Sequence, residues 1–203
     1  MALYPVVIPV SGAVQRLSGH RKVAALSECA REALRLSAEK AGVVLGELRK
    51  DGDDVPLPFG EYHWSVSHKP RYVAAVIGPG RMGIDIEEIA SRKENIFGYV
   101  ASDEEWSLFG GKSWDSLYRC WTAKEAVVKS TGTGLAGLKS CRVVDVPDTT
   151  NITVLFEGRL HQVEQLLHDG HVIAVLKDDN PVEWAVTDRP TALGYGLPLM
   201  RSI

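Results

Sequence analysis

Two helical segments, each closed by a glycine and each followed by strands, constrain the fold of this chain most strongly. Apolar residues recur at three- and four-residue steps from about Leu17 to Ala41, and Gly42 stands where a helix C-cap would. A second strong helix is predicted from Trp114 to Thr131, ending at Gly132. Because an amphipathic helix must bury its apolar face, each one requires a sheet or another helix to pack against.

Runs rich in valine and isoleucine predict strands over much of the remaining chain. The segment 1–16 is predicted to be extended, and 50–60 is predicted to be a loop. The segment 92–110 is predicted to be irregular with helical parts. Glu157-Gly158 and Asp169-Gly170 have the residues of tight hairpin turns. The predicted strands are 63–67, 71–78, 82–89, 152–156, 160–167, 172–177 and 182–186.

Each half of the chain therefore has a helix first and an antiparallel pair of strands second. Arg31–Leu34 parallels Lys124–Val127, and Tyr72–Ile77 parallels Val172–Leu176, which is a weak internal echo. We expect an α+β fold with a pseudo-two-fold arrangement of two similar α+β lobes, each a helix packed on a small antiparallel sheet. The expected N-terminal lobe covers residues 1–89 and the C-terminal lobe residues 90–203.

Composition excludes several classes of protein. With 45% hydrophobic and 24% charged residues in 203, the chain is globular rather than disordered, fibrous or a membrane bundle. A net charge of -3 argues against a nucleic-acid-binding protein. Cys29, Cys120 and Cys141 form no CxxC pair, which favours a reducing compartment. With no signal peptide or spanning segment in the sequence, we expect a cytoplasmic protein.

A pair of acids lies on one predicted strand, in Gly83-Ile84-Asp85-Ile86-Glu87. Strand alternation puts Ile84 and Ile86 on one face and Asp85 and Glu87 side by side on the other. Two neighbouring carboxylates repel unless a cation lies between them, and hard oxygen ligands suit Mg²⁺. Taken alone, the pattern also fits an exposed strand face that carries acids.

Further polar residues could serve phosphate chemistry. Glu125 and Lys129 lie one helical turn apart, so Glu125 could be a third carboxylate for the same ion, and Lys129 could neutralise phosphate charge or move a proton. Ser67 and His68 offer a hydroxyl and an imidazole to a phosphate, and Arg31 could bind one bidentately. Each alone also fits a surface ion pair, a strand-end turn or a solvated arginine.

In their order and spacing these motifs resemble the 4′-phosphopantetheinyl transferase family. The motifs are Trp64-Ser65-Val66-Ser67-His68, then Gly83–Glu87, then Trp121–Leu135 with its Lys-Glu-Ala and a following lysine. The likeness covers residues 64–135 and extends toward the Arg31 helix, whereas residues after about 140 match only in β character. At this length the chain resembles the long, two-lobed, surfactin-synthetase-activating class, whose members are monomers.

The resemblance implies transfer of the 4′-phosphopantetheine group of coenzyme A to a serine of an apo acyl- or peptidyl-carrier protein, releasing adenosine 3′,5′-bisphosphate. It implies Mg²⁺ as cofactor, coenzyme A as co-substrate, and carrier proteins of fatty-acid, polyketide or non-ribosomal peptide biosynthesis as partners. No nucleic acid and no membrane is expected as a partner. Basic residues that could contact an acidic carrier are Arg92, Lys93, Lys112 and Arg119.

The resemblance also implies site residues. Asp85, Glu87 and Glu125 match the family's magnesium ligands. Glu105 stands where many members carry a glutamate near the metal. The positions that match coenzyme A-binding residues are Arg31, Ser67, His68, Lys124 and Lys129.

The implied catalytic residues are Glu125, Lys129 and His68. Glu125, or a metal-bound water, would take the serine proton; Lys129 would stabilise or protonate the leaving phosphate; and His68 would hold phosphate. The chain departs from the family at one point, because Gly52-Asp53-Asp54-Val55-Pro56 replaces the Gly-Lys-Pro of many long members, and only Lys50 is near.

Two alternatives stay open from the sequence. Another Mg²⁺-dependent phosphotransferase or nucleotide hydrolase could use the same carboxylates. The second alternative is a non-catalytic module that binds coenzyme A or a nucleotide. The clustered acids disfavour this alternative, because binding alone does not require them.

Overall fold

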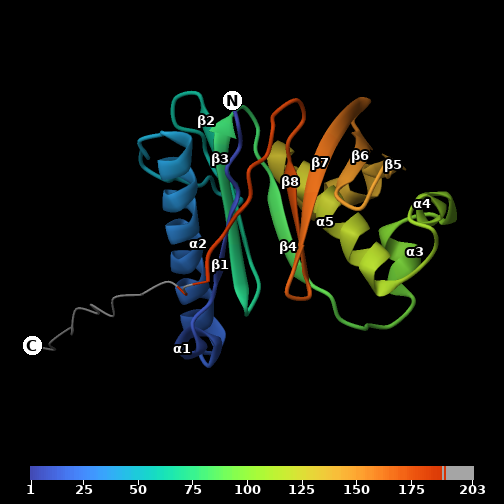
Figure 1. Ribbon diagram of the computed structural model, residues 1–203, viewed down its shortest axis with the longest axis horizontal. Coiled ribbons are helices and arrows are strands. Elements are labelled where there is room, and N and C mark those ends of the chain that lie inside the picture. The colour runs from blue at the N-terminus through green and yellow to red at the C-terminus, as the bar shows by residue number, and fades with distance from the viewer. Residues whose placement is uncertain (189, 191–203) are drawn as a thin grey trace, which may run out of the picture.

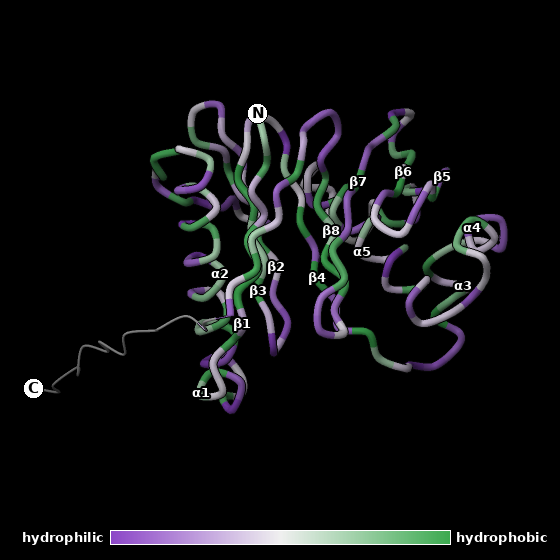
Figure 2. Tube along the Cα trace, viewed as in Figure 1, coloured by the Kyte–Doolittle hydropathy of each residue, from purple (hydrophilic) through white to green (hydrophobic). Residues whose placement is uncertain are grey.

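The computed structural model describes residues 1–188 and 190, apart from the side chains of residues 135 and 136. In this part of the chain two β-sheets lie face to face, and a long helix covers the outer face of each (Figure 1). The predicted α+β class, with helices packed on two sheets, is confirmed. Hydrophobic residues concentrate along the central strands of both sheets (Figure 2). Among the described residues no helix combines the length and the hydropathy that a bilayer crossing requires.

The first sheet has the strand order β2-β3-β1-β9 and packs against α2. Strand β3 shows why: Val73, Ala75 and Ile77 belong to the core against α2, whereas Ala74 and Val76 face the second sheet. The elements of this lobe are β1 (Val6–Pro9), α1 (Gly12–Gln15), α2 (Gly19–Ala41), β2 (Tyr62–His68) and β3 (Tyr72–Pro79).

The second sheet has the order β4-β8-β7-β6-β5 and packs against α5. Its elements are β4 (Ile84–Glu88), α3 (Ile96–Val100), α4 (Asp103–Leu108), α5 (Trp114–Thr131), a 3₁₀ turn η1 (Gly134–Ser140), β5 (Arg142–Asp145), β6 (Asn151–Phe156), β7 (Arg159–His168) and β8 (His171–Leu176).

The two predicted long helices are confirmed, and both end at the predicted residue, although α2 begins at Gly19 rather than at about Leu17. Gly42 and Gly132 both adopt the left-handed conformation of a C-cap, with φ of 68° and 72°. Both predicted hairpin turns are present, since Glu157-Gly158 and Asp169-Gly170 have positive φ at both residues. The sequence did not predict α1, within the segment expected to be extended, or β5.

A core between the sheets joins the two lobes. Ile84 and Ile86 of β4 belong to it and are fully buried, which places Asp85 and Glu87 on the opposite face of that strand, as predicted. Although β4 precedes residue 89, it belongs to the second sheet, so the chain changes sheets between β3 and β4. The other members of this core are Leu3, Val7, Ala74, Val76, Met82, Ile173 and Val175.

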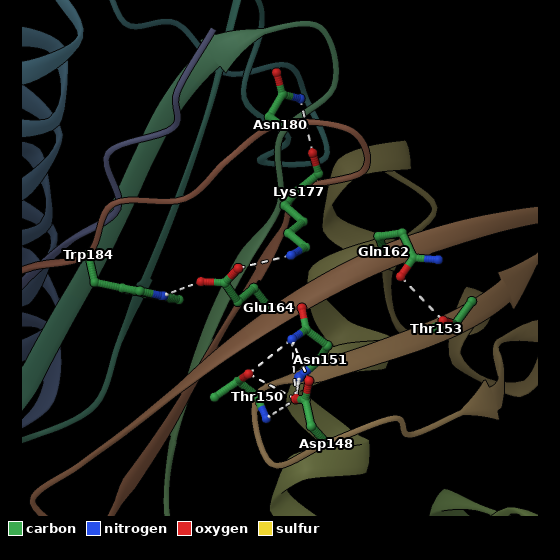
Figure 3. A network of polar contacts seen from close by, with 9 residues as sticks. All are labelled: Asp148, Thr150, Asn151, Thr153, Gln162, Glu164, Lys177, Asn180 and Trp184. Atoms are coloured by element: carbon green, nitrogen blue, oxygen red, sulfur yellow. Dashed lines mark hydrogen bonds and ion pairs between the residues drawn. The ribbon is translucent and has the colours of Figure 1, made fainter.

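The segment after β8 returns to the first lobe and closes the structure. The strand expected at 182–186 is reduced to β9 (Ala185–Val186), which pairs parallel with β1, so the first sheet is mixed rather than purely antiparallel. Glu164 of β7 holds this segment, since it accepts hydrogen bonds from Lys177 Nζ and Trp184 Nε1, each at 3.0 Å (Figure 3). The returning segment therefore contacts both sheets.

The position of α5 depends on a close approach to Gly83, just before β4. A Cβ at Gly83 would lie 1.8 Å from the Ala126 carbonyl oxygen and 2.8 Å from the Ala126 carbonyl carbon. Because both atoms belong to helix backbone, neither can move alone.

We expect Gly83→Ala to destabilise the protein by about 3 kcal/mol, because the added methyl group pushes α5 away from β4. Urea denaturation measures the change. Gly98→Ala in α3 is the matched control, since a Cβ there meets nothing within 4 Å. Equal stabilities for the two variants would contradict this account of the packing.

Candidate active site

A cavity of about 900 Å³ lies between the two lobes. One wall comes from α2 and the loop that follows it, a second from β2, and a third from the C-terminal half of α5. Five predicted site residues line it, namely Arg31, Ser67, His68, Glu125 and Lys129.

Asp85 lies where the two lobes meet and is 4% exposed. Its Oδ1 accepts hydrogen bonds from Ser67 Oγ at 2.9 Å and from Lys129 Nζ at 2.6 Å. Lys129 Nζ also donates to the Ile84 carbonyl oxygen at 3.1 Å. Asp85 Oδ2 is buried and has no hydrogen-bond partner among the described residues. A buried carboxylate oxygen without a partner is costly, so this atom is free to accept a cation or a donor.

Glu87 and Glu125 complete the acidic cluster. Lys69 Nζ lies 2.8 Å from Glu87 Oε1. Burial raises the pKa of Glu87, while the bond to Lys69 opposes that rise. Burial, reinforced by the charges of Asp85 and Glu87, raises the pKa of Glu125 to about 7, although Lys129 opposes it. The charge of Asp85 therefore disfavours the ionised forms of Glu87 and Glu125, and a divalent cation would relieve that repulsion.

The donor chemistry of this cluster fits Mg²⁺. Asp85, Glu87 and Glu125 offer only oxygens, one of them buried and unpartnered. In the described part of the chain, however, no group of three His, Cys, Asp or Glu side chains is arranged to hold a metal ion. Asp85 and Glu87 are instead paired with Lys129 and Lys69. Metal binding at these acids would thus require the lysine contacts to rearrange.

Arg31, Lys50 and His68 lie on other parts of the cavity lining. Arg31 lies on the exposed face of α2, where its guanidinium is 2.9 Å from Glu28. Burial, with the charge of Lys129, lowers the pKa of His68, so its imidazole is neutral at neutral pH. Lys50 also lines the cavity, 3.0 Å from Asp54. Lys50 is therefore the lysine available on the side where the family's Gly-Lys-Pro lysine is missing.

Lys124 does not lie with the other predicted ligand-binding residues. Its side chain is 3% exposed, and its Nζ is 2.7 Å from Glu105 Oε1 and 2.8 Å from the Val100 carbonyl oxygen. Glu105 in turn accepts from the Ser102 and Val143 backbone amides and caps α4. Both residues therefore form a buried ion pair that joins α4, α5 and β5, away from the cavity.

The sequence did not single out two residues of the site. Ser65 Oγ accepts a hydrogen bond from the Ile84 amide at 3.1 Å and so helps Ser67 to join β2 to β4. Lys69 pairs with Glu87. Ser65 alternates with Ser67 on β2, and Lys69 directly follows His68, so position in the motif is the one signal that could have found them.

We expect Glu125→Gln to change the pH dependence of stability in the metal-free protein. Because the folded-state pKa of Glu125 is raised from about 4.5 to about 7, its stabilising contribution is complete below pH 4.5 and is lost as the pH rises through 7. Because glutamine does not ionise, Glu125→Gln does not lose this stability as the pH rises. Above pH 7 its free energy of unfolding should exceed that of wild type by on the order of 2 kcal/mol, after allowing for solvent screening.

Urea denaturation in EDTA across this pH range measures the difference. It should vanish below about pH 4.5, where Glu125 is protonated in both states. A stability difference between variant and wild type that stays constant with pH would contradict the raised pKa of Glu125.

We expect Lys124→Met to destabilise the protein by about 3 kcal/mol, because it leaves Glu105 buried without a counter-charge. Lys112→Met is the matched control, since Lys112 forms an exposed pair with Asp103 and should change stability by less than about 1 kcal/mol. Thermal melting reports both. If Lys124→Met weakened coenzyme A binding at unchanged stability, Lys124 would be a ligand-binding residue after all.

The chain is similar to known proteins over part of its length. The model of the 4′-phosphopantetheinyl transferase superfamily matches residues 81–176, which include Asp85, Glu87, Glu125 and Lys129. A Bacillus subtilis 4′-phosphopantetheinyl transferase is 28% identical over 103 residues, 48% of this chain and 45% of that protein. A Haemophilus influenzae protein, provisionally assigned as a 4′-phosphopantetheinyl transferase, is 29% identical over 114 residues. This alignment covers 52% of this chain and 48% of that protein.

The alignments thus span about half the length of these relatives. Arg31, Ser67 and His68 lie outside the matched region of the superfamily model, and their roles rest on the geometry of the cavity. Residues 81–176, just under half of the chain, are thus similar to the 4′-phosphopantetheinyl transferase superfamily.

Proposed function

We propose that this protein transfers the 4′-phosphopantetheine group of coenzyme A to a serine of an apo acyl- or peptidyl-carrier protein and releases adenosine 3′,5′-bisphosphate. The observation that carries the proposal is a cavity between the lobes that is lined by Glu125 and by basic residues. Two of its lining residues, Ser67 and Lys129, bond to Asp85 of the acidic cluster behind its wall. Its volume, about 900 Å³, falls within the range of ligand and cofactor pockets. We further expect the enzyme to act as a monomer in the cytoplasm.

The basic residues of the cavity suit the phosphates of coenzyme A. Arg31 and Lys50 have exposed side chains on the cavity wall and are free to exchange Glu28 and Asp54 for phosphate oxygens. A neutral His68 can donate a hydrogen bond to a phosphate oxygen without adding charge. Apolar residues on the same walls, Val23, Leu48, Val55, Val66 and Val128, can contact the uncharged parts of the ligand.

The proposed reaction is an in-line displacement at phosphorus. The carrier serine oxygen attacks the pantetheine-side phosphorus of the pyrophosphate, and the bond from that phosphorus to the oxygen of the adenosine-side phosphate breaks. When bound at Asp85, Glu87 and Glu125, Mg²⁺ supplies electrostatic stabilisation of the charge that develops on the pyrophosphate oxygens.

Two residues of α5 would handle the proton and the leaving group. Glu125, which lines the cavity, would accept the serine proton. Lys129 Nζ, now 2.6 Å from Asp85, would stabilise the negative charge on the leaving phosphate. Since the two side chains lie one turn apart on one helix, the same rigid element positions both.

Among the basic residues considered for contact with an acidic carrier, Arg92 and Lys93 are better placed than Arg119. Arg119 is bound internally, since it donates to Gln165 Oε1 at 3.0 Å and to the Asp148 carbonyl oxygen at 2.9 Å. Lys112 is exposed but is paired with Asp103. Lys93 is exposed in the loop between β4 and α3, and Arg92 beside it donates to the Tyr118 hydroxyl at 3.0 Å.

We expect an apo carrier protein to gain one phosphopantetheine arm, about 340 Da, after incubation with this protein, coenzyme A and Mg²⁺. Intact-mass spectrometry measures the gain, and EDTA should abolish it. Glu125→Gln should reduce the rate by about 100-fold or more. The matched control is Glu61→Gln, an exposed glutamate ahead of β2, which should retain the wild-type rate.

Other outcomes separate the alternatives. No mass gain on a panel of carriers, with coenzyme A still bound, would favour a coenzyme A-binding module. Coenzyme A cleavage without a modified carrier would favour another phosphotransferase or a hydrolase. Full activity of Glu125→Gln at saturating Mg²⁺ would remove Glu125 from the mechanism.

A further inference from the structure

Lys69 contacts the acidic cluster but has no part in the mechanism above. It directly follows β2, and its backbone amide donates to the Tyr72 carbonyl oxygen at 2.8 Å in the turn to β3. Its Nζ is 2.8 Å from Glu87 Oε1. The Glu87 side chain is 14% exposed and the Lys69 side chain is 32% exposed. The carboxylate of this pair is therefore more shielded from solvent than the ammonium is.

The two lysines of the cluster are held differently. Lys129 lies on α5, and its ammonium binds both Asp85 and the Ile84 carbonyl oxygen. The ammonium of Lys69 is carried by a turn, and Glu87 is its one partner among the described residues. The two lysine side chains are about equally exposed, at 32% for Lys69 and 30% for Lys129. Because its ammonium has fewer contacts, Lys69 can leave its acid with less loss than Lys129 can.

The cluster's charges indicate what this pairing does. When ionised, Asp85, Glu87 and Glu125 carry three negative charges, against two positive charges from Lys69 and Lys129. A divalent cation that enters beside Glu87 meets a carboxylate oxygen already occupied by an ammonium, and like charges repel at this distance. The cation can therefore bind Glu87 fully only if the lysine moves away.

We propose that Lys69 is a resident counter-ion of the metal site, which a divalent cation must displace from Glu87, and that it thereby sets the cation concentration at which the site fills. This inference rests on the proposed function, which makes Asp85, Glu87 and Glu125 the metal ligands. It gives Lys69 a role in metal affinity rather than in substrate contact. The same displacement leaves its ammonium at the solvent-exposed edge of the cluster.

Calorimetric titration of Mg²⁺, and separately of Mn²⁺, into metal-stripped protein tests the proposal. At about pH 8 and without coenzyme A, Lys69→Gln should bind the cation at least about fivefold more tightly than wild type, because no ion pair has to be broken. Lys69→Arg keeps the charge and should stay within about twofold of wild type. Lys40→Gln, on the exposed end of α2, is the matched control for net charge and should also stay within about twofold.

A second measurement uses the unaltered protein. Selective ¹³C labelling of lysine side chains should show the Lys69 Cε resonance, assigned with the Lys69→Arg variant, moving as Mg²⁺ is added, while that of Lys40 does not move. This readout tests the displacement even if Lys69→Gln fails to fold.

The possible results distinguish failure of this inference from failure of the proposed function. If wild type binds the cation and Lys69→Gln binds it equally or less tightly, or if the Lys69 resonance does not move, the inference fails while the proposed function stands. If wild type binds neither cation with or without coenzyme A, the metal assignment in the proposed function fails and the inference with it.

Discussion

The buried carboxylate of Asp85 is the contact on which both the fold and the candidate site depend. It accepts from Ser67 of the first lobe and from Lys129 of the second, so a single acidic group at the edge of β4 joins both lobes at the cavity. Burial of an ionised acid is costly unless it is paired and hydrogen-bonded, and these two donors compensate one of its oxygens. The other oxygen has no partner among the described residues, so it is available to bind a cation or a hydrogen-bond donor.

Strand and helix periodicity place the rest of the cluster around this acid. On β4, Ile84 and Ile86 fill the core between the sheets, so the residues that alternate with them must face the site. On α5, consecutive side chains point about 100° apart, so anchoring Lys124 to Glu105 on one side turns Glu125 toward the cavity on another. Gly83 permits the helix to come close enough for both sets of residues to meet.

The sequence predicted the elements whose signals are local. The periodicity of α2 and α5, the glycines that end them, and the alternation that pairs Asp85 with Glu87 all lie within a few turns or residues. Contacts set by distant segments were not predictable in this way. No local signal brings β9 to β1, some 180 residues away in sequence, and none showed that Lys124 would bury its charge against Glu105 rather than reach a ligand. Lys69, which directly follows the Trp64–His68 motif, was not singled out because its partner Glu87 lies on β4, in the other sheet.

We propose above that Asp85, Glu87 and Glu125 form one divalent-cation site at the junction of the lobes. Anomalous diffraction from crystals grown with Mn²⁺ and coenzyme A tests it most directly, because the manganese signal locates the ion independently of any activity. We expect a single strong peak in contact with oxygens of these three carboxylates and of the pyrophosphate. A peak at other residues, or bound coenzyme A with no ion beside these acids, would contradict it.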